Sequence, residues 1–123
     1  MKTNMSSDPR YFADIANGLL HLAADKIVAD SKGAITASAH MTEVGLRAGG
    51  TSYELALDAT KSDGTQFCFG VDIDPSKRPS SRVELLRDGV SQSLVLYNIA
   101  KGSEPFLQAI TDTTLRLRGQ LGL

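Results

Sequence analysis

The most regular pattern in this chain is the alternation of apolar and polar positions over residues 51–74, interrupted once by Lys61-Ser62-Asp63-Gly64. The apolar positions of the two runs are Tyr53, Leu55, Leu57 and Ala59, then Phe67, Phe69, Val71 and Ile73. A period of two on both sides of an Asp-Gly turn signal is typical of an antiparallel hairpin with one buried face. We therefore predict two paired strands whose odd-numbered side chains enter the core.

Three further strands are predicted around this hairpin. Residues 34–47 form the first, but Val44 and Leu46 fall on the opposite parity from the earlier apolar residues of that strand. A β-bulge near Thr42-Glu43 would restore the register. Residues 82–87 form the fourth strand, and Asp88-Gly89 is a second hairpin signal.

The fifth strand, residues 90–100, is apolar on both faces. Leu94 and Leu96 occupy one parity, and the other parity holds Val95, Tyr97 and Ile99. Such a strand is covered on both sides or leaves one face for a partner. If both helices of the chain lie on one face of the sheet, the other face stays exposed.

A helix is predicted at each end of this strand region. Asp8 and Pro9 suit the N-cap and the first position of a helix that runs to about Ala29, and Ser103-Glu104-Pro105 opens the last helix. Apolar residues recur at helical spacing in both; they are Phe12, Ile15, Ala16, Leu19, Ala23 and Ile27, then Phe106, Leu107, Ile110, Thr114, Leu117 and Leu121. We expect Ile15 to join the core of the hairpin and Gly18 to allow close packing on the sheet.

The resulting order, α-β-β-β-β-β-α, predicts an α+β fold with a five-stranded antiparallel sheet flanked by an N-terminal and a C-terminal helix. In outline this layout resembles small α+β architectures in which a helix packs in the concavity of a curved antiparallel sheet, and secretion-chaperone-like folds. We expect residues 1–7 to form a flexible lead and residues 8–123 a single domain.

Composition narrows the classes of function. The chain has 123 residues, a formal net charge of −1 and one cysteine, Cys68. The charge provides no field that would attract nucleic acid or an anionic membrane, and one cysteine forms no internal disulfide. No apolar run approaches the roughly 20 residues that span a bilayer, and residues 1–7 lack the apolar core of a signal peptide. We expect a cytoplasmic protein.

Acidic side chains are the first candidate for chemistry. Asp72 and Asp74 share the outward parity of one strand with Glu54 and Asp58 on its neighbour, and Mg²⁺ or Ca²⁺ uses oxygen ligands of this kind. A D-x-D spacing is common and the ligand set is incomplete. We therefore favour a solvated strand face and expect no metal and no cofactor.

The other candidate sites of chemistry also lack the neighbouring residues that such chemistry needs. His40, with Glu43 nearby, and His21 lack the neighbours of a zinc site, and Cys68 lacks a base that would make it a nucleophile. Three cations form a small basic patch that could contact phosphate, although a solvated loop is the interpretation we favour; they are Lys77, Arg78 and Arg82.

Two hypotheses of different class follow. The first is a non-catalytic protein-binding module: an adaptor, chaperone or inhibitor that binds another protein, or pairs with itself as a homodimer, or does both. Its partner-binding residues would be Val95, Tyr97, Ile99 and Leu121, because surplus apolar surface on a small domain indicates a partner. The second is a small-ligand-binding or enzymatic α+β cone, with a pocket between the first helix and the sheet lined by Tyr53, Phe67, Phe69 and Met41.

Overall fold

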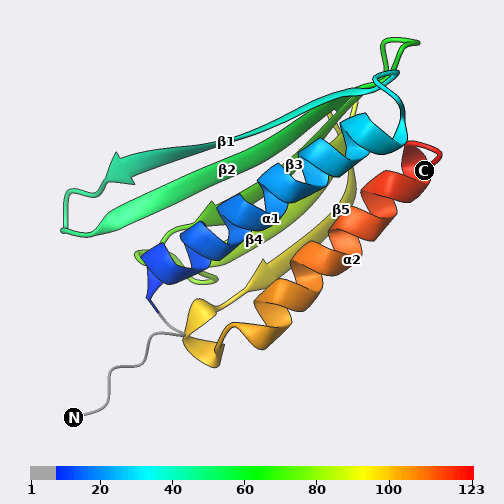
Figure 1. The fold of residues 1–123 in the computed structure, drawn as a ribbon. Helices are drawn as coiled ribbons and strands as arrows, with labels where there is room; N and C mark the ends of the chain where they lie inside the picture. Colours follow the sequence, from blue (N-terminus) through cyan, green and yellow to red (C-terminus); the bar gives the residue numbers. More distant parts are fainter. Residues whose placement is uncertain (1–7) are drawn as a thin grey trace.

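A computed structural model describes residues 8–123 of the chain, which form one helix, five antiparallel strands and a second helix (Figure 1). The helices are α1 (Pro9–Asp30) and α2 (Glu104–Gln120). The strands are β1 (Thr36–Gly45), β2 (Thr51–Thr60), β3 (Gln66–Ile73), β4 (Ser81–Arg87) and β5 (Val90–Tyr97), and a short 3-10 helix, η2 (Ile99–Lys101), follows them. The strands pair in chain order, which confirms the predicted α+β layout. The predicted lead, residues 1–7, lies outside the described residues.

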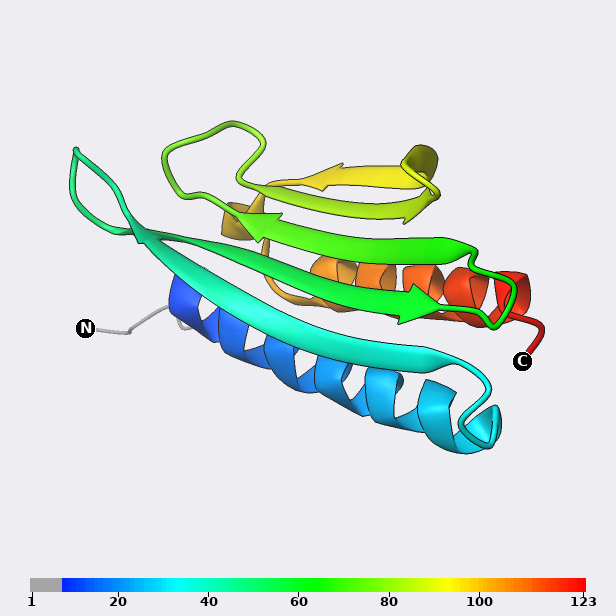
Figure 2. The same cartoon turned by 90° about the horizontal axis from the view of Figure 1, so that it is seen from above.

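Both helices lie on the same face of the sheet. Helix α1 packs mainly on β1 and β2, and α2 packs beside it on β4 with contacts to β3 and β5. Figure 2 shows the sheet from above with both helices beneath it. Within residues 8–123 no helix covers the opposite side, which we call the outer face. The molecule therefore has two layers.

The two hairpins confirm the turn signals. In β2 and β3, Leu57 lies opposite Phe69, and the Thr65 amide donates to the Asp63 carboxylate in the turn between them. Between β4 and β5, Asp88 and Gly89 have φ angles of 48° and 81°. Two consecutive positive φ angles define the two-residue turn that matches the twist of a hairpin.

The core lies between the helices and the inner face of the sheet. Its largest side chains are fully buried phenylalanines contributed by both helices and β3: Phe12, Phe67, Phe69 and Phe106. Ile15, which we expected in this core, is only half-buried, whereas Leu20 and Ala13 are buried. The alanine-rich side of α1 faces the sheet, so the buried stripe is rotated away from Ile15.

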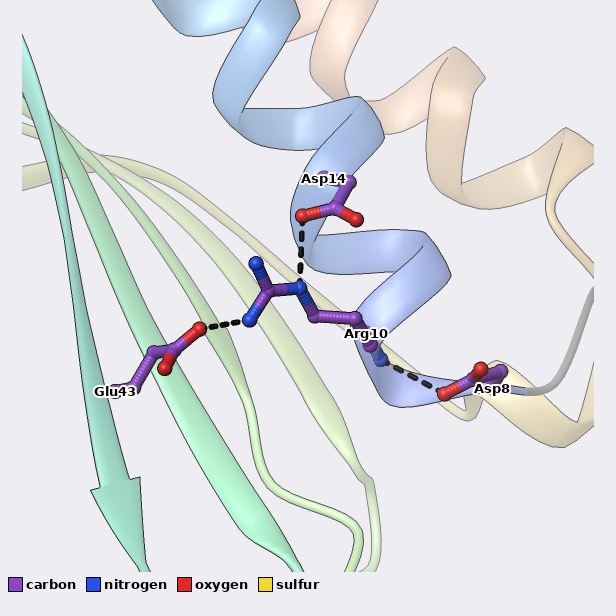
Figure 3. A network of polar contacts seen from close by, with 4 residues as sticks. All are labelled: Asp8, Arg10, Asp14 and Glu43. Atoms are coloured by element: carbon purple, nitrogen blue, oxygen red, sulfur yellow. Dashed lines mark hydrogen bonds and ion pairs between the residues drawn. The ribbon is translucent and has the colours of Figure 1, made fainter.

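Strand β1 corrects a second expectation, because its register with β2 is continuous and contains no bulge. Glu43 lies opposite Tyr53 and so has the parity of the inner face, while Val44 points outward. Figure 3 shows why the carboxylate is tolerated there: Arg10 on α1 forms an ion pair with Glu43 and a second with Asp14. The register therefore continues without a bulge: Glu43 keeps its inward position through the ion pair with Arg10, and Val44 stays on the outer face.

The bulge of this sheet lies instead between β4 and β5. Leu86 pairs with Ser91 and Leu85 with Ser93, so Gln92 is the extra residue. Strand β5 also ends earlier than predicted, at Tyr97, because the chain turns into η2. Ile99 therefore lies in the 3-10 helix.

We predict that Phe69→Ala lowers the free energy of unfolding by about 3–5 kcal/mol, since it leaves a cavity at a fully buried site. Thermal denaturation should show a fall in melting temperature of roughly 10–25 °C. Gln66→Ala on the same strand, where the side chain is exposed, is the matched control. A shift of only a degree or two for Phe69→Ala would show that this face is not the core.

Gly18 is exposed, and a Cβ added there meets no atom within 4 Å, so our expectation of close packing on the sheet is wrong. We predict that Gly18→Ala stabilises the fold by about 0.5–1 kcal/mol, because alanine loses less backbone entropy in a helix. Urea denaturation measures the change. Gly64→Ala, at a φ of 90°, should destabilise in the same assay. A destabilising Gly18→Ala would contradict the exposed position of Gly18.

Candidate functional site

The outer face is organised as three rows of side chains that cross the strands in register. The first row is Thr42, Glu54, Asp72, Arg82 and Leu96; the central row is His40, Ala56, Gly70, Glu84 and Leu94; the third is Ser38, Asp58, Cys68, Leu86 and Ser91. Apolar side chains gather at the β5 end of these rows. Carboxylates gather over β2, β3 and β4.

Negative charge is concentrated on this face. The three rows hold four carboxylates and one arginine, although the whole chain has a net charge of only −1. Arg82 donates to Glu84 at 3.0 Å. Within residues 8–123, neither Glu54 nor Asp72 forms an ion pair.

Glu54 and Asp72 lie directly opposite each other on neighbouring strands. Like charges in this position destabilise a sheet. The pKa of Asp72 is raised by burial and next by the charge of Glu54, despite the opposing effect of Arg82. The like-charge repulsion of this pair is therefore only partly offset by Arg82, which lies opposite Asp72 on β4, and by Lys77.

A hollow of about 410 Å³ opens beside this pair, under the loop that joins β3 to β4. Its lining includes Leu96 and all three residues of the predicted basic loop, Lys77, Arg78 and Arg82. Arg78 donates to two loop carbonyls, those of Pro75 and Lys77. The structure thus brings the basic loop and the carboxylate pair to one hollow, a juxtaposition that the sequence did not indicate.

Asp74 belongs to the loop rather than to the strand face. Its carboxylate accepts from the Ser76 hydroxyl at 2.6 Å and from the Ser76 amide at 2.9 Å. These hydrogen bonds, the side-chain bond first, lower the pKa of Asp74. Asp74 therefore shapes the turn, and Asp72 alone of the D-x-D pair belongs to the outer face.

Cys68 is half-buried in the third row, opposite Asp58. Burial first, and then the Asp58 carboxylate, raise the pKa of its thiol to about 11. A nucleophilic cysteine needs a lowered pKa and an electropositive setting. The surroundings of Cys68 work in the opposite direction.

The two histidines have few neighbours that could act with them in acid-base catalysis or metal binding. His40 Nδ1 lies 3.8 Å from the Asp58 carboxylate, with both side chains exposed, and it is on the opposite face from Glu43. His21 is exposed on α1. Among the residues described, no group of three His, Cys, Asp or Glu side chains is arranged to hold a metal ion.

Strand β5 is a free edge of the sheet with exposed apolar side chains on both faces. Leu94 and Leu96 are 46% and 56% exposed on the outer face, and Val95 is 40% exposed on the inner side. The strand contains no charged residue. Natural edge strands are usually blunted by charges, prolines or a cover, so β5 is unusually open to pairing.

The other edge, β1, has such protection. Glu43 is a charged residue with inward parity, and Arg10 of α1 forms an ion pair with it across the edge (Figure 3). An inward-pointing charge is one of the devices that prevent edge-to-edge association. The two edges of the sheet therefore differ in kind.

The four residues predicted to bind a partner differ in their exposure. Val95 is exposed, whereas Ile99 and Leu121 are buried in the core of the chain itself. Tyr97 is half-buried, stacks near Phe106 and donates its hydroxyl hydrogen bond to the Gly102 carbonyl. The exposed apolar surface instead includes Leu94 and Leu96.

The residues expected to line a pocket beneath the first helix are packed together. Tyr53, Phe67 and Phe69 are buried members of the hydrophobic core, and Met41 packs against it. A separate apolar hollow lies between the two helices, where Leu22 and Leu115 are exposed. Leu115 was missed because it falls outside the predicted apolar stripe of the last helix.

No family model matches the chain, and no significant match was found among curated proteins or solved structures. Helices α1 and α2 are each too short or too polar to cross a membrane.

We predict that alkylation of Cys68 by iodoacetamide accelerates about tenfold per pH unit from pH 7 to pH 10, because only the thiolate reacts and its pKa is about 11. Asp58→Asn should increase the rate at a fixed pH, since it removes a charge that raises the pKa. The urea-unfolded chain provides the reference. A plateau near pH 9 in the folded protein would contradict the assigned environment.

Proposed function

We propose that this chain is a non-catalytic protein-binding module that contacts its partner through strand β5. The observation that carries the proposal is the asymmetry of the two sheet edges: β1 has an inward charge paired with α1, and β5 has none. An uncharged edge strand with exposed apolar side chains is a template for strand addition from another chain.

The exposed residues Leu94, Val95 and Leu96 would provide the side-chain contacts. An added strand would satisfy the free backbone groups of the β5 edge, and its side chains would pack beside these three on both faces of the extended sheet. Tyr97 would support the strand from below through its contacts with Phe106 and Gly102. The added strand could come from a second copy, as in a homodimer, or from another protein.

The non-catalytic part of the proposal has separate support. The raised pKa of Cys68 disfavours the thiolate. His40 lies near the Asp58 carboxylate, but both side chains are exposed, so they do not form an enclosed acid-base pair. The residues that would line a ligand pocket beneath α1 belong to the packed core.

We predict that Leu94→Lys weakens association by about tenfold or more, because it places a charge on the apolar edge. Val44→Lys is the matched control: Val44 is 42% exposed, points to the same outer face and lies on the opposite edge. Sedimentation velocity of the purified chain at high micromolar concentration measures the homodimer.

If the wild-type chain is monomeric, immobilised wild-type and variant chains are compared for capture of proteins from the native host. The proposal expects bands that Leu94→Lys loses and Val44→Lys retains. Equal behaviour of the two variants in both assays would refute β5 as the contact strand.

A further inference from the structure

We propose that the strand added to β5 is β5 of a second copy, in an antiparallel pairing whose two-fold axis passes through Val95. The pairing joins two five-stranded sheets into one continuous sheet. This inference rests on the proposed function, that the chain binds through β5, and it names both the partner and the register. The length of β5 and its pattern of side chains lead to the same register.

The length of regular backbone on β5 sets the overlap of the two strands. Gln92 is the extra residue of the bulge, and after Tyr97 the chain turns into η2. Between these two interruptions lie the five residues 93–97. Two identical antiparallel segments overlap completely only when their middle residue lies on the axis. The middle residue of this segment is Val95.

The side chains of the segment complement themselves in that register. Leu94 of one copy lies opposite Leu96 of the other, and the axis repeats this pair, so the exposed leucines of both copies meet on the outer face. On the inner face, Val95 lies opposite Val95. The smallest shift that keeps outward side chains outward is two residues, and it places Leu96 opposite Gln92 or Leu94 opposite Asn98. The register of greatest overlap is therefore also the one that pairs apolar side chains on both faces.

The charges beside the segment also favour a second copy. Strand β5 contains no charged residue. On β4, Arg82 lies beside Leu96, and Glu84 lies beside Leu94. Each pair of leucines is therefore bordered by Arg82 of one copy and by Glu84 of the other, which are charges of opposite sign.

The other edge of the sheet directs the pairing to β5 of the second copy. Pairing of β5 with β1 of another copy is head-to-tail and continues as a filament. Strand β1 carries the inward Glu43 with its ion pair to Arg10, a device that prevents such pairing (Figure 3). Pairing of β5 with β5 uses the open edge of both copies and ends at a dimer whose two outer edges are both β1.

The helices leave room for the second sheet. Helix α2 packs mainly on β4. The two β4 strands of the dimer are three strand spacings apart, so their α2 helices lie about 14 Å from each other. Packed helices approach to about 8–10 Å. The two α2 helices therefore lie side by side beneath the joined sheet without overlap.

Disulfide mapping tests the register. All variants also carry Cys68→Ser, which removes the native thiol, and copper-phenanthroline oxidation is followed by non-reducing electrophoresis. Directly opposite residues have Cα atoms about 4.5–5.5 Å apart, which a disulfide spans, whereas diagonal neighbours are about 7–8 Å apart. We predict a covalent dimer from Val95→Cys alone. Leu94→Cys and Leu96→Cys should each give at least about fivefold less, and a mixture of the two should form the mixed dimer. Val44→Cys, at the β1 edge, is the control and should give only background.

Charge substitutions test the same pairing without a covalent bond. Leu94→Lys and Leu96→Glu should each weaken the dimer about tenfold in sedimentation velocity, because each places a charge on the apolar edge. An equimolar mixture of the two should recover association, since the introduced lysine and glutamate then lie opposite each other. A mixture of Leu94→Lys with Val44→Glu is the control and should not recover.

A wild-type chain that stays monomeric at high micromolar concentration would overturn the inference. So would equal covalent dimer from Leu94→Cys and Val95→Cys, or a charge mixture that associates no better than its two components. If the chain is monomeric but Leu94→Lys loses host proteins that Val44→Lys captures, only the second copy is refuted as the partner. If those two variants do not differ in any assay, the proposed function fails as well.

Discussion

The corner after β5 is the constraint on which the rest of this structure depends, because it decides which face of the sheet α2 covers. Ile99 in η2 is buried, and its amide donates to the Ser80 hydroxyl at 2.9 Å. Phe106 then enters the core against Phe12, with ring centroids 5.0 Å apart. These contacts place α2 beside α1 on the inner face. Because both helices lie on one face, the outer face is uncovered within residues 8–123. The outer-face side chains, including Leu94 and Leu96 at the β5 edge, are therefore open to a partner.

The destabilising features of the chain are gathered on the uncovered side. Gly70 weakens the middle strand, Glu54 and Asp72 repel each other, and Leu94 and Leu96 remain exposed. The two charged residues with inward parity on the strands are both accommodated: Glu43 is paired with Arg10, and Arg87, at the end of β4, lies over the Phe67 ring. Sites that bind partners commonly sacrifice local stability in this way. The edge of β5 and the outer face are continuous through Leu94 and Leu96, so a single partner could contact both.

The sequence was sufficient to predict the hairpins, the order of helices and strands along the chain, and the outward direction of Glu54, Asp58 and Asp72. It was sufficient because a period of two and an Asp-Gly turn are local signals. It failed for β1, since the ion pair between Arg10 and Glu43 joins residues far apart in the chain. It also placed Ile99 on a strand, because parity does not indicate where a strand ends. The glycine at an outward strand position, Gly70, was visible in the sequence, but that neither helix covers it was not.

The central claim is that this chain meets its partner on β5 and the adjoining outer face rather than on β1. Site-specific photo-crosslinking in the native host tests it most directly, with the photoreactive residue placed at Leu94 or, in a parallel strain, at Val44. Both positions are comparably exposed at the two edges of the same face. The account predicts a discrete crosslinked product from position 94 and none above background from position 44. A product from position 44 alone, or none from either, would contradict it.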